Sequence, residues 1–404
     1  MSDGQLLTPD QLRERVERLA ALERGSASRG ERAASDLIEA ELRGLGLEVR
    51  RDVEVVHGGY WLPVGLATAA GVVAAAARRV PGVLLGSLAA AAVVDDIDAG
   101  PRVLRRTLLA KRETANLSVE VGPPDAETTV LVVAHYDAPH SGLVFHPQLP
   151  RTVLRNFPAI ASRAKTAPPT MWGAIAGPAL SALGAALRSR RLRVAGGLLS
   201  AGYAVAMADI GLRGVVPGAN DNASGVAAVL AVAHWLAAEP PPVRVILLFT
   251  GSEESLLEGM QRYGERHFAR LDRERTHVIC LDTVGSPHLV ALEAEGMVRM
   301  RHFPRRLLEL LHECAGELGV YVQRGLSFRN TTDATVALKA GYPAVMIGSA
   351  DEFMIPTDYH WPTDTADRVN YPTVADAARL VQAMIRRLGA QPSAAAGSPA
   401  ASSA

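Results

Sequence analysis

The chain has 404 residues, of which 48% are hydrophobic, and its 42 lysines and arginines balance 42 aspartates and glutamates. This length can bury a large core in two or three domains, and zero net charge excludes a whole-molecule electrostatic attraction to nucleic acid. Because there are only two cysteines, Cys280 and Cys314, a disulfide framework is excluded and a reducing compartment is indicated.

The first 59 residues predict two helices followed by a strand. Thr8 is a suitable N-cap, and Pro9 occupies the first helical position of a helix through TPDQLRERVERLAALE. A second helix is expected from about Glu31 to Arg43, and LEVRRDVEVV then alternates like a half-buried strand. This region lacks the basic start and apolar core of a secretory signal peptide, so we expect none.

Two pairs of uncharged, apolar segments interrupt this soluble pattern. Residues 61–77 and 80–94 are joined by two arginines, and residues 171–187 and 194–210 are joined by RSRRLR. A membrane-spanning helix needs about 20 apolar residues, with a range of about 17 to 25, so these segments lie at or just under the limit. We favour membrane hairpins through residues 61–94 and 171–210. The alternative is a soluble helical cap, or an interface between copies in a homo-oligomer.

The basic residues around these segments indicate an orientation. The two links carry six arginines, whereas the flanks on the side of the remaining chain carry ten basic residues. If the hairpins span a membrane, the positive-inside tendency favours a membrane-associated protein with its folded domain in the cytoplasm. A soluble cytoplasmic protein is the alternative. The two sets are Arg78, Arg79, Arg188, Arg190, Arg191 and Arg193 in the links, and Arg102, Arg105, Arg106, Lys111, Arg112, Arg151, Arg155, Arg163, Lys165 and Arg213 in the flanks.

The rest of the chain alternates strands and helices. TVLVVAHYD reads as a buried strand that ends in polar residues, and from Asn220 onward a helix and a strand ending at Thr250 follow. The strands HVICLD and PAVMIG alternate with helices through RRLLELLHECAGEL and VADAARLVQAMIRRL, after a helix around residues 256–268. This order predicts an α/β fold with a mostly parallel sheet flanked by helices. The low-complexity residues 391–404 are expected to be disordered.

Histidines and carboxylates follow the predicted strands. Separately each has an ordinary explanation, such as an N-cap or a solvated turn, but parallel strands open at their carboxyl ends onto a ligand crevice. Two histidines with several carboxylates and no cysteine are typical of hydrolytic zinc, and the surplus of carboxylates indicates two ions. The residues are His135 and Asp137 after TVLVVA, Asp221 in GANDNASG, Glu253 and Glu254 in FTGSEES, Asp282 after HVICL, and His360 in DYHWPTDT.

An ordered set of motifs then resembles a known family. HYD, GANDNASG, FTGSEESLLEGM, LDTVG and YHWPTDT are similar, in this order, to the motifs of the two-zinc aminopeptidase family. This family includes aminopeptidase Y, bacterial leucyl aminopeptidases and glutamate carboxypeptidase II. The resemblance covers roughly residues 10–57, 114–140 and 214–389, and it implies a three-layer fold like that of zinc exopeptidases.

The resemblance implies a set of metal ligands. His135 and Asp282 would bind one Zn²⁺, Glu254 and His360 would bind the other, and Asp221 would bridge both.

The resemblance also implies three further roles. Asp137 would accept a hydrogen bond from His135 and fix the tautomer of its ring. Glu253 would be the general base that takes a proton from the metal-bridging water, so that a hydroxide attacks the peptide bond. Tyr359 would stabilise the tetrahedral oxyanion, with an ordinary packed aromatic ring as the alternative.

The sequence departs from the family pattern at three places. His135 and Asp221 are 86 residues apart, farther than is usual in the family, because the second apolar pair lies between them. The first pair interrupts an early strand region, and Ala334 follows Asp333 where the family often has histidine. We therefore expect a catalytic domain in three parts, 1–59, 113–170 and 214–390, two apolar helical insertions, 60–112 and 171–213, and the tail, 391–404.

The sequence thus predicts a zinc-dependent exopeptidase that acts on peptides, with an aminopeptidase favoured. A carboxypeptidase or a single-zinc enzyme like glutaminyl cyclase would share the fold. A metal-free, membrane-associated binding protein is the alternative from another functional class. Retention of all five ligand positions favours the two-zinc enzyme over the other readings.

Overall fold

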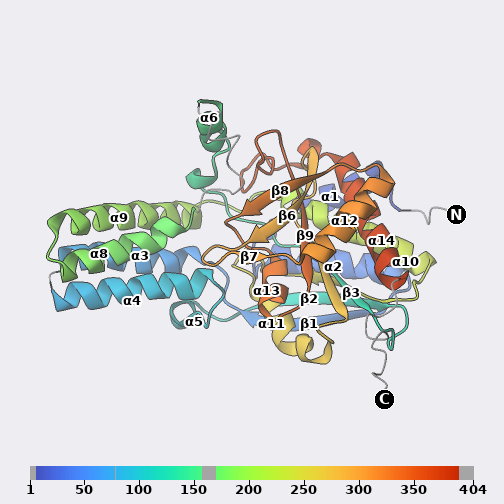
Figure 1. Cartoon of the computed structure of the whole chain (residues 1–404), viewed down its shortest axis with the longest axis horizontal. Coiled ribbons are helices and arrows are strands. Elements are labelled where there is room, and N and C mark those ends of the chain that lie inside the picture. The colour runs from blue at the N-terminus through green and yellow to red at the C-terminus, as the bar shows by residue number, and fades with distance from the viewer. Residues whose placement is uncertain (1–5, 78, 157–169, 391–404) are drawn as a thin grey trace, which may run out of the picture.

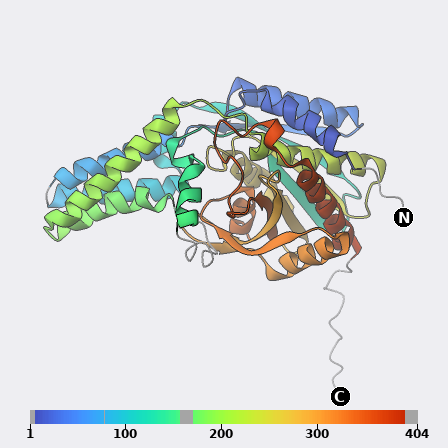
Figure 2. The same cartoon turned by 90° about the horizontal axis from the view of Figure 1, so that it is seen from above.

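The computed structural model describes residues 6–77, 79–156 and 170–390. These residues form an α/β body from which a bundle of helices projects at one end (Figure 1, Figure 2). The predicted fold class, a mostly parallel central sheet flanked by helices, is confirmed. The tail expected to be disordered, 391–404, lies outside the described residues.

One nine-stranded sheet forms the centre of the body. Its strands are β1 (Val49–Val56), β2 (Arg112–Val121), β3 (Thr129–His135), β4 (Arg244–Thr250), β5 (Thr276–Leu281), β6 (His288–Glu295), β7 (Arg301–His302), β8 (Val322–Phe328) and β9 (Ala344–Ala350). The order is β1-β2-β4-β3-β5-β9-β6-β7, and β8 pairs with β6. Because β4, β3, β5 and β9 run parallel, their carboxyl ends meet at one edge of the sheet.

Helices cover both faces of this sheet. The body helices are α1 (Pro9–Ala20), α2 (Arg29–Gly44), α10 (Gly225–Ala238), α11 (Glu258–His267), α12 (Arg305–Leu318), α13 (Asp333–Lys339) and α14 (Tyr371–Ala390). Side chains of α1, α2, α10, α12 and α14 share one core with Val130 and Val132 of β3. Those of α11 and α13 share a second core with Leu131 and Val133. Alternate residues of β3 therefore enter opposite cores, which explains its uninterrupted apolar sequence.

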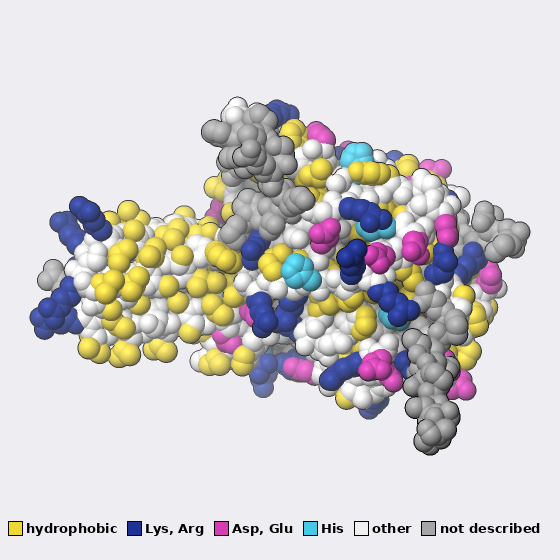
Figure 3. Space-filling view, viewed as in Figure 1, with side chains coloured by type: hydrophobic (Ala, Val, Ile, Leu, Met, Phe, Trp, Pro, Cys, Tyr) yellow, Lys and Arg dark blue, Asp and Glu magenta, His cyan; other side chains and the backbone are white. Residues whose placement is uncertain are grey.

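The two apolar insertions fold into one bundle. Its helices are α3 (Trp61–Ala76), α4 (Val80–Ile97), α8 (Trp172–Ala186) and α9 (Arg190–Leu212). Within the bundle, α3 packs against α4 and α9, and α8 packs against the same two helices. Each hairpin thus packs against the other. The bundle projects away from the body (Figure 1, Figure 2). Its visible surface is largely hydrophobic, with basic side chains at the far end (Figure 3).

Two short helices lie where the bundle meets the body. They are α5 (Val103–Leu108), which follows α4, and α6 (Gln148–Asn156). Arg105 of α5 is fully buried, forms an ion pair with Asp96 of α4 and donates a hydrogen bond to the carbonyl of Ser255. Its guanidinium also lies 3.4 Å from the carboxylate of Glu258. The base of the bundle is therefore bound directly to the turn that follows β4.

Candidate metal centre

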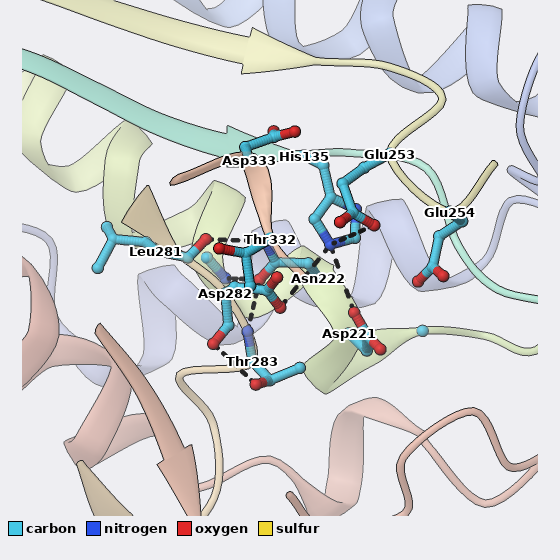
Figure 4. A network of polar contacts seen from close by, with 12 residues as sticks. His135, Asp221, Asn222, Glu253, Glu254, Leu281, Asp282, Thr283, Thr332 and Asp333 are labelled. Carbon is cyan, nitrogen blue, oxygen red and sulfur yellow. Dashed lines mark hydrogen bonds and ion pairs between the residues drawn. The ribbon is translucent and has the colours of Figure 1, made fainter. Parts of the chain in front are cut away.

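The predicted site residues of β3, β4 and β5 meet at the carboxyl edge of the sheet. His135 is the last residue of β3, Glu253 and Glu254 lie in the turn after β4, and Asp282 directly follows β5 (Figure 4). β3 pairs in parallel with both β4 and β5, so these three chain segments leave the sheet side by side. Strand order therefore brings all four residues to one edge of the sheet.

Asp221 and His360 reach the same place from loops. Asp221 lies in residues 219–224, a kinked segment that leads into α10 and in which Asp221 and Asn222 have non-helical backbone angles. The carboxylate of Asp364 accepts hydrogen bonds from the backbone N–H groups of Asn220, at 2.7 Å, and Asp221, at 3.0 Å. His360 lies in the loop after β9, where its ring stacks on that of Tyr359 with centroids 3.9 Å apart.

Asp221 faces both imidazoles through different oxygens. Its Oδ1 lies 3.4 Å from Nε2 of His135, and its Oδ2 lies 3.2 Å from Nε2 of His360. Each imidazole also faces a second carboxylate. Oδ1 of Asp282 is 3.8 Å from Nε2 of His135, and Oε2 of Glu254 is 3.4 Å from Nε2 of His360. The five side chains thus form two groups that share Asp221.

These separations fit zinc. Two atoms bound to one tetrahedral zinc ion at about 2.0–2.1 Å lie about 3.3–3.4 Å apart, close to the 3.2–3.8 Å separations between the donor atoms. Donor atoms of His135, Asp221 and Glu254 all lie within 4.8 Å of one another. Imidazole and carboxylate without thiolate is also the donor set of catalytic zinc. The residues present therefore fit the metal that their chemistry implies.

Asp137 binds the turn that carries the two glutamates. Its carboxylate accepts hydrogen bonds from the N–H groups of Glu253 and Glu254, both at 3.0 Å, and from the hydroxyl of Ser26 at 2.6 Å. Oδ1 of Asp137 lies 3.4 Å from Nδ1 of His135, an ion-pair contact without the alignment of a hydrogen bond. Asp137 is fully buried, so it fixes the turn against β3 without contacting the crevice.

The cluster carries strong negative potential. Burial raises the pKa values of Glu253, Glu254 and Asp282 above their ordinary range, and neighbouring carboxylates raise them further. Burial opposes ionisation of Asp221 as well, but contacts with the two imidazoles lower its pKa below the ordinary value. Burial also works against a charged His135, yet the surrounding carboxylates raise its pKa well above the usual range. These opposed shifts are expected where carboxylates converge on a cation site.

The chain is similar to known peptidases over part of its sequence. A family model described as peptidase family M28 matches residues 204–385. The resemblance to zinc aminopeptidases is confirmed. The matched range contains Asp221, Glu254, Asp282 and His360, whereas His135 lies before it, on the other side of the second insertion. The match supports a metallopeptidase, and no curated protein sequence matches the chain.

Solved structures of this fold include two kinds of enzyme. A Zn-dependent exopeptidase from Parabacteroides distasonis is 14% identical over 96% of this chain and 99% of that chain, with a TM-score of 0.56. An aminopeptidase from Aneurinibacillus sp. strain AM-1 is 13% identical over 94% and 93%, with a TM-score of 0.57. A glutaminyl cyclase from Fimbriiglobus ruber is 16% identical over 94% and 95%, with a TM-score of 0.54. At such identities the similarity establishes the shared fold.

Glu253 and Tyr359 lie beside the five candidate metal ligands. Oε2 of Glu253 is 4.0 Å from Nε2 of His135, and its side chain is 10% exposed. Tyr359 stacks on His360 and lines the same cavity as the two glutamates. Its hydroxyl makes no hydrogen bond within the described part of the chain, and burial raises its pKa well above the usual value. Both side chains therefore border the space in which a substrate would meet the metal.

Three supporting residues were not singled out by the sequence. Arg24 is fully buried and donates hydrogen bonds to the carbonyls of Tyr136, at 2.9 Å, and of Pro217 and Gly218. It therefore ties the HYD segment to the loop that carries Asp221. Asp364 and Asn222 lie inside the YHWPTDT and GANDNASG motifs, whose polar residues were the available signal. No motif marks Arg24.

Asn222 joins two of the segments that carry candidate metal ligands. Its side-chain amide donates to the carbonyl of Leu281 at 2.9 Å, and its carbonyl oxygen accepts from the N–H of Thr283 at 3.0 Å (Figure 4). These bonds flank Asp282 on both sides. The positions of Asp221 and Asp282 are thus fixed relative to each other by the residue that follows Asp221.

Proposed function

We propose that the protein is a two-zinc aminopeptidase, with His135 and Asp282 on one ion, Glu254 and His360 on the other, and Asp221 shared. The shared carboxylate is the observation that carries this proposal. Its two oxygens lie 3.4 Å and 3.2 Å from two different imidazoles, an arrangement that suits a bridge between two ions. Zinc supplies electrophilic activation of a carbonyl and lowers the pKa of water toward about 7.

Glu253 is assigned as the general base. A carboxylate oxygen of Glu253 takes a proton from the attacking water and delivers it to the leaving nitrogen. Three features support this role: Glu253 borders the cavity, lies next in sequence to the ligand Glu254, and has its backbone fixed by Asp137. The Tyr359 hydroxyl is assigned to the oxyanion of the tetrahedral intermediate. Its free hydroxyl and its contact with His360 support this role.

A second, mostly apolar cavity supports a preference for apolar residues. It has a volume of about 290 Å³ and extends from Glu253, Glu254 and His360 toward the base of the bundle. A substrate whose N-terminal residue has a large aliphatic or aromatic side chain would exclude water from this space, and each buried CH₂ would contribute about 0.8 kcal/mol. We therefore expect the protein to prefer substrates with an N-terminal leucine or phenylalanine. The apolar side chains of the wall include Phe145, Leu256, Met297, Phe328, Met354 and Ile355.

The deciding experiment compares Glu253→Gln with the wild-type protein. We expect about two zinc ions per chain in both, by elemental analysis, and a loss of about 10²–10⁴-fold in kcat on leucyl p-nitroanilide for Glu253→Gln only. Glu265→Gln is the matched control, because Glu265 is an exposed residue of α11 that pairs with Arg262. Full activity of Glu253→Gln would remove Glu253 from the mechanism, and a protein without zinc would contradict the proposal as a whole.

A glutaminyl cyclase is the second candidate, because structures of such enzymes share the fold at TM-scores of 0.53 to 0.56. The same zinc measurement separates the two enzymes, since the cyclase reading predicts one ion per chain. Incubation with a peptide that begins with glutamine adds a direct test. Mass spectrometry would detect loss of ammonia for a cyclase and loss of the first residue for an aminopeptidase. Loss of the last residue would instead identify a carboxypeptidase.

A further inference from the structure

The bundle exposes more large hydrophobic side chains than the body does. Small residues make most of its helix contacts, and Val64, Val93, Ile97, Met207 and Ile210 are its larger buried side chains. Many of its other large aliphatic side chains are exposed. Among the described residues, 14 of the 22 exposed large hydrophobic side chains lie on its four helices or at the end of α8. They are Leu62, Leu66, Val72, Val73, Val80, Leu84, Leu88, Trp172, Leu183, Leu187, Val194, Leu198, Val205 and Leu212. In water such a surface would be costly, because single domains rarely expose large apolar patches.

Glycines set the spacing inside the bundle. A Cβ atom at Gly71 would lie 2.5 Å from Oγ of Ser200, and one at Gly196 would lie 2.5 Å from the backbone nitrogen of Ser181. A Cβ atom at Gly86 would lie 2.7 Å from the carbonyl oxygen of Pro178. The helices thus approach too closely for any larger residue at these positions. Close contact through small residues is how helices associate in a lipid bilayer, where burying aliphatic side chains gains little.

Charges are confined to the two ends of the bundle. α3 and α8 contain no charged residue, α4 has its charges only at Asp95 and Asp96, and α9 has none between Arg193 and Asp209. Exposed arginines lie at the turns farthest from the body, where dark blue atoms end the yellow surface (Figure 3). An uncharged band therefore separates two charged ends, as a bilayer requires. These arginines are Arg79, Arg188, Arg190 and Arg191.

Two of the four bundle helices are long enough for a full crossing, whereas α3 and α8 are shorter, with 16 and 15 residues. α4 and α9, with 18 and 23 residues, are long and apolar enough to span, and only 33% and 22% of their apolar windows are buried. At 1.5 Å per residue they are about 27 and 34 Å long, against about 30 Å for the hydrocarbon core of a bilayer. The uncharged parts are shorter, but arginine side chains at the far end can extend to the headgroups. A bundle inserted only halfway would leave these arginines in hydrocarbon.

We propose that the bundle α3, α4, α8 and α9 is inserted across a lipid bilayer, with its outward aliphatic side chains in contact with lipid. A second copy of this chain is the competing occupant of the apolar surface. However, the exposed aliphatic residues are distributed over all four helices, and a flat protein interface would cover one side only. A bilayer surrounds the bundle and covers every side. This proposal concerns the bundle alone and does not depend on the chemistry of the metal centre.

Flotation of the full-length protein with vesicles tests the proposal. Protein purified in detergent is reconstituted into vesicles of phosphatidylcholine and phosphatidylglycerol and centrifuged through a density gradient after a carbonate wash. We expect wild-type protein to float with the vesicles. For a fourfold variant, the fraction of protein that floats should be at least tenfold lower than for wild type. Its substitutions are Leu66→Gln, Leu84→Gln, Leu88→Gln and Leu198→Gln. The control is Val53→Gln, Val55→Gln, Tyr321→Gln, which changes exposed apolar residues of the body and should float as wild type does.

Depth-dependent quenching gives a second readout that does not depend on the folding of the fourfold variant. A fluorophore is attached to Leu88→Cys, Leu198→Cys or Arg190→Cys, while Cys280 and Cys314 remain buried. Lipids with a nitroxide in the middle of the acyl chain should quench Leu88→Cys and Leu198→Cys at least threefold more strongly than Arg190→Cys. Equal, weak quenching at all three positions would overturn the proposal. A detergent-free soluble dimer that shields Leu88 and Leu198 would assign the surface to a second copy instead.

Discussion

At the scale of single residues, one aspartate holds the acidic pair in place. Asp137 accepts hydrogen bonds from the N–H groups of Glu253 and Glu254 and from the hydroxyl of Ser26. This fixes the direction in which each glutamate leaves the turn, so that Glu254 meets His360 while Glu253 lies beside His135. Under the proposed function, these adjacent residues would serve two different tasks, metal binding by Glu254 and proton transfer by Glu253.

Removal of one hydroxyl tests the role assigned to Tyr359. In Tyr359→Phe the ring still stacks on His360, so zinc content and the thermal midpoint should stay near wild-type values. Loss of a hydrogen bond that forms mainly in the transition state should lower kcat by about 10–10³-fold and leave KM nearly unchanged. Steady-state kinetics on leucyl p-nitroanilide provide the measurement. An unchanged kcat would show that Tyr359 only packs as an aromatic ring and does not stabilise the oxyanion.

The convergence of the proposed metal ligands at one place could be predicted because sequence and topology act together. His135, Glu254 and Asp282 each follow a strand, and parallel strands deliver their ends to one edge whatever the rest of the fold does. Arg24 and Asp364 could not be predicted in the same way. Arg24 donates hydrogen bonds to carbonyl groups more than 100 residues away in sequence, and no local sequence pattern predicts such a contact.

At the scale of elements, the junction between bundle and body is unusually polar. Arg105 of α5 lies between Asp96 of α4 and Glu258 of α11, and Glu258 accepts hydrogen bonds from the N–H groups of His57 and Gly58. Arg105 is fully buried, and the side chains of Asp96 and Glu258 are nearly so. These groups connect the entry to α3, the exit from α4 and the turn that carries Glu253 and Glu254.

Neutralising Arg105 should destabilise the protein strongly. In Arg105→Met, Asp96 and Glu258 remain as buried carboxylates that have lost their main partner, a change that typically costs about 3–5 kcal/mol. Arg106→Met is the matched control, because Arg106 is the exposed neighbour on the same helix and should change stability by less than about 0.5 kcal/mol. Denaturant unfolding in detergent, with zinc content measured beside it, provides the comparison. Equal stability of the two variants would contradict this account of the junction.

Several elements were not anticipated from the sequence. β6, β8 and α13 were not among the predicted elements, although β6 pairs with three other strands. β8 reads VQRGLSF, which has neither the apolar run of β3 nor a regular alternation, and its place depends on pairing with β6. The two hairpins were expected from their composition, but their union in one bundle was not, because that contact joins segments far apart in the chain.

At the scale of the whole molecule, the two charged ends of the bundle define a direction across a membrane. We expect the body on the cytoplasmic side, since the sequence has more basic residues near the body than in the distal links. The arginines of the distal turns would then lie outside. This orientation also agrees with the two buried, free cysteines, which fit a reducing compartment.

Cysteine labelling in intact cells tests this orientation. A membrane-impermeant maleimide should label Arg190→Cys in the distal turn before lysis, and it should label Glu265→Cys, on the exposed face of α11, only after lysis. The two variants serve as controls for each other, because both positions are exposed and neither lines the cavities at the proposed metal centre. The reverse pattern would place the body outside the cytoplasm, and labelling of both before lysis would contradict a sealed crossing.

The buried charges around Arg105 also limit how the protein can be shortened. All five proposed zinc ligands lie outside residues 60–112 and 171–213, so a chain without both insertions would still contain all five residues. The excised chain would nevertheless lose the guanidinium that binds the Ser255 carbonyl and lies against the carboxylate of Glu258, four residues after Glu254. A water-soluble version of the enzyme is therefore better sought by exchanging lipid-facing side chains than by truncation.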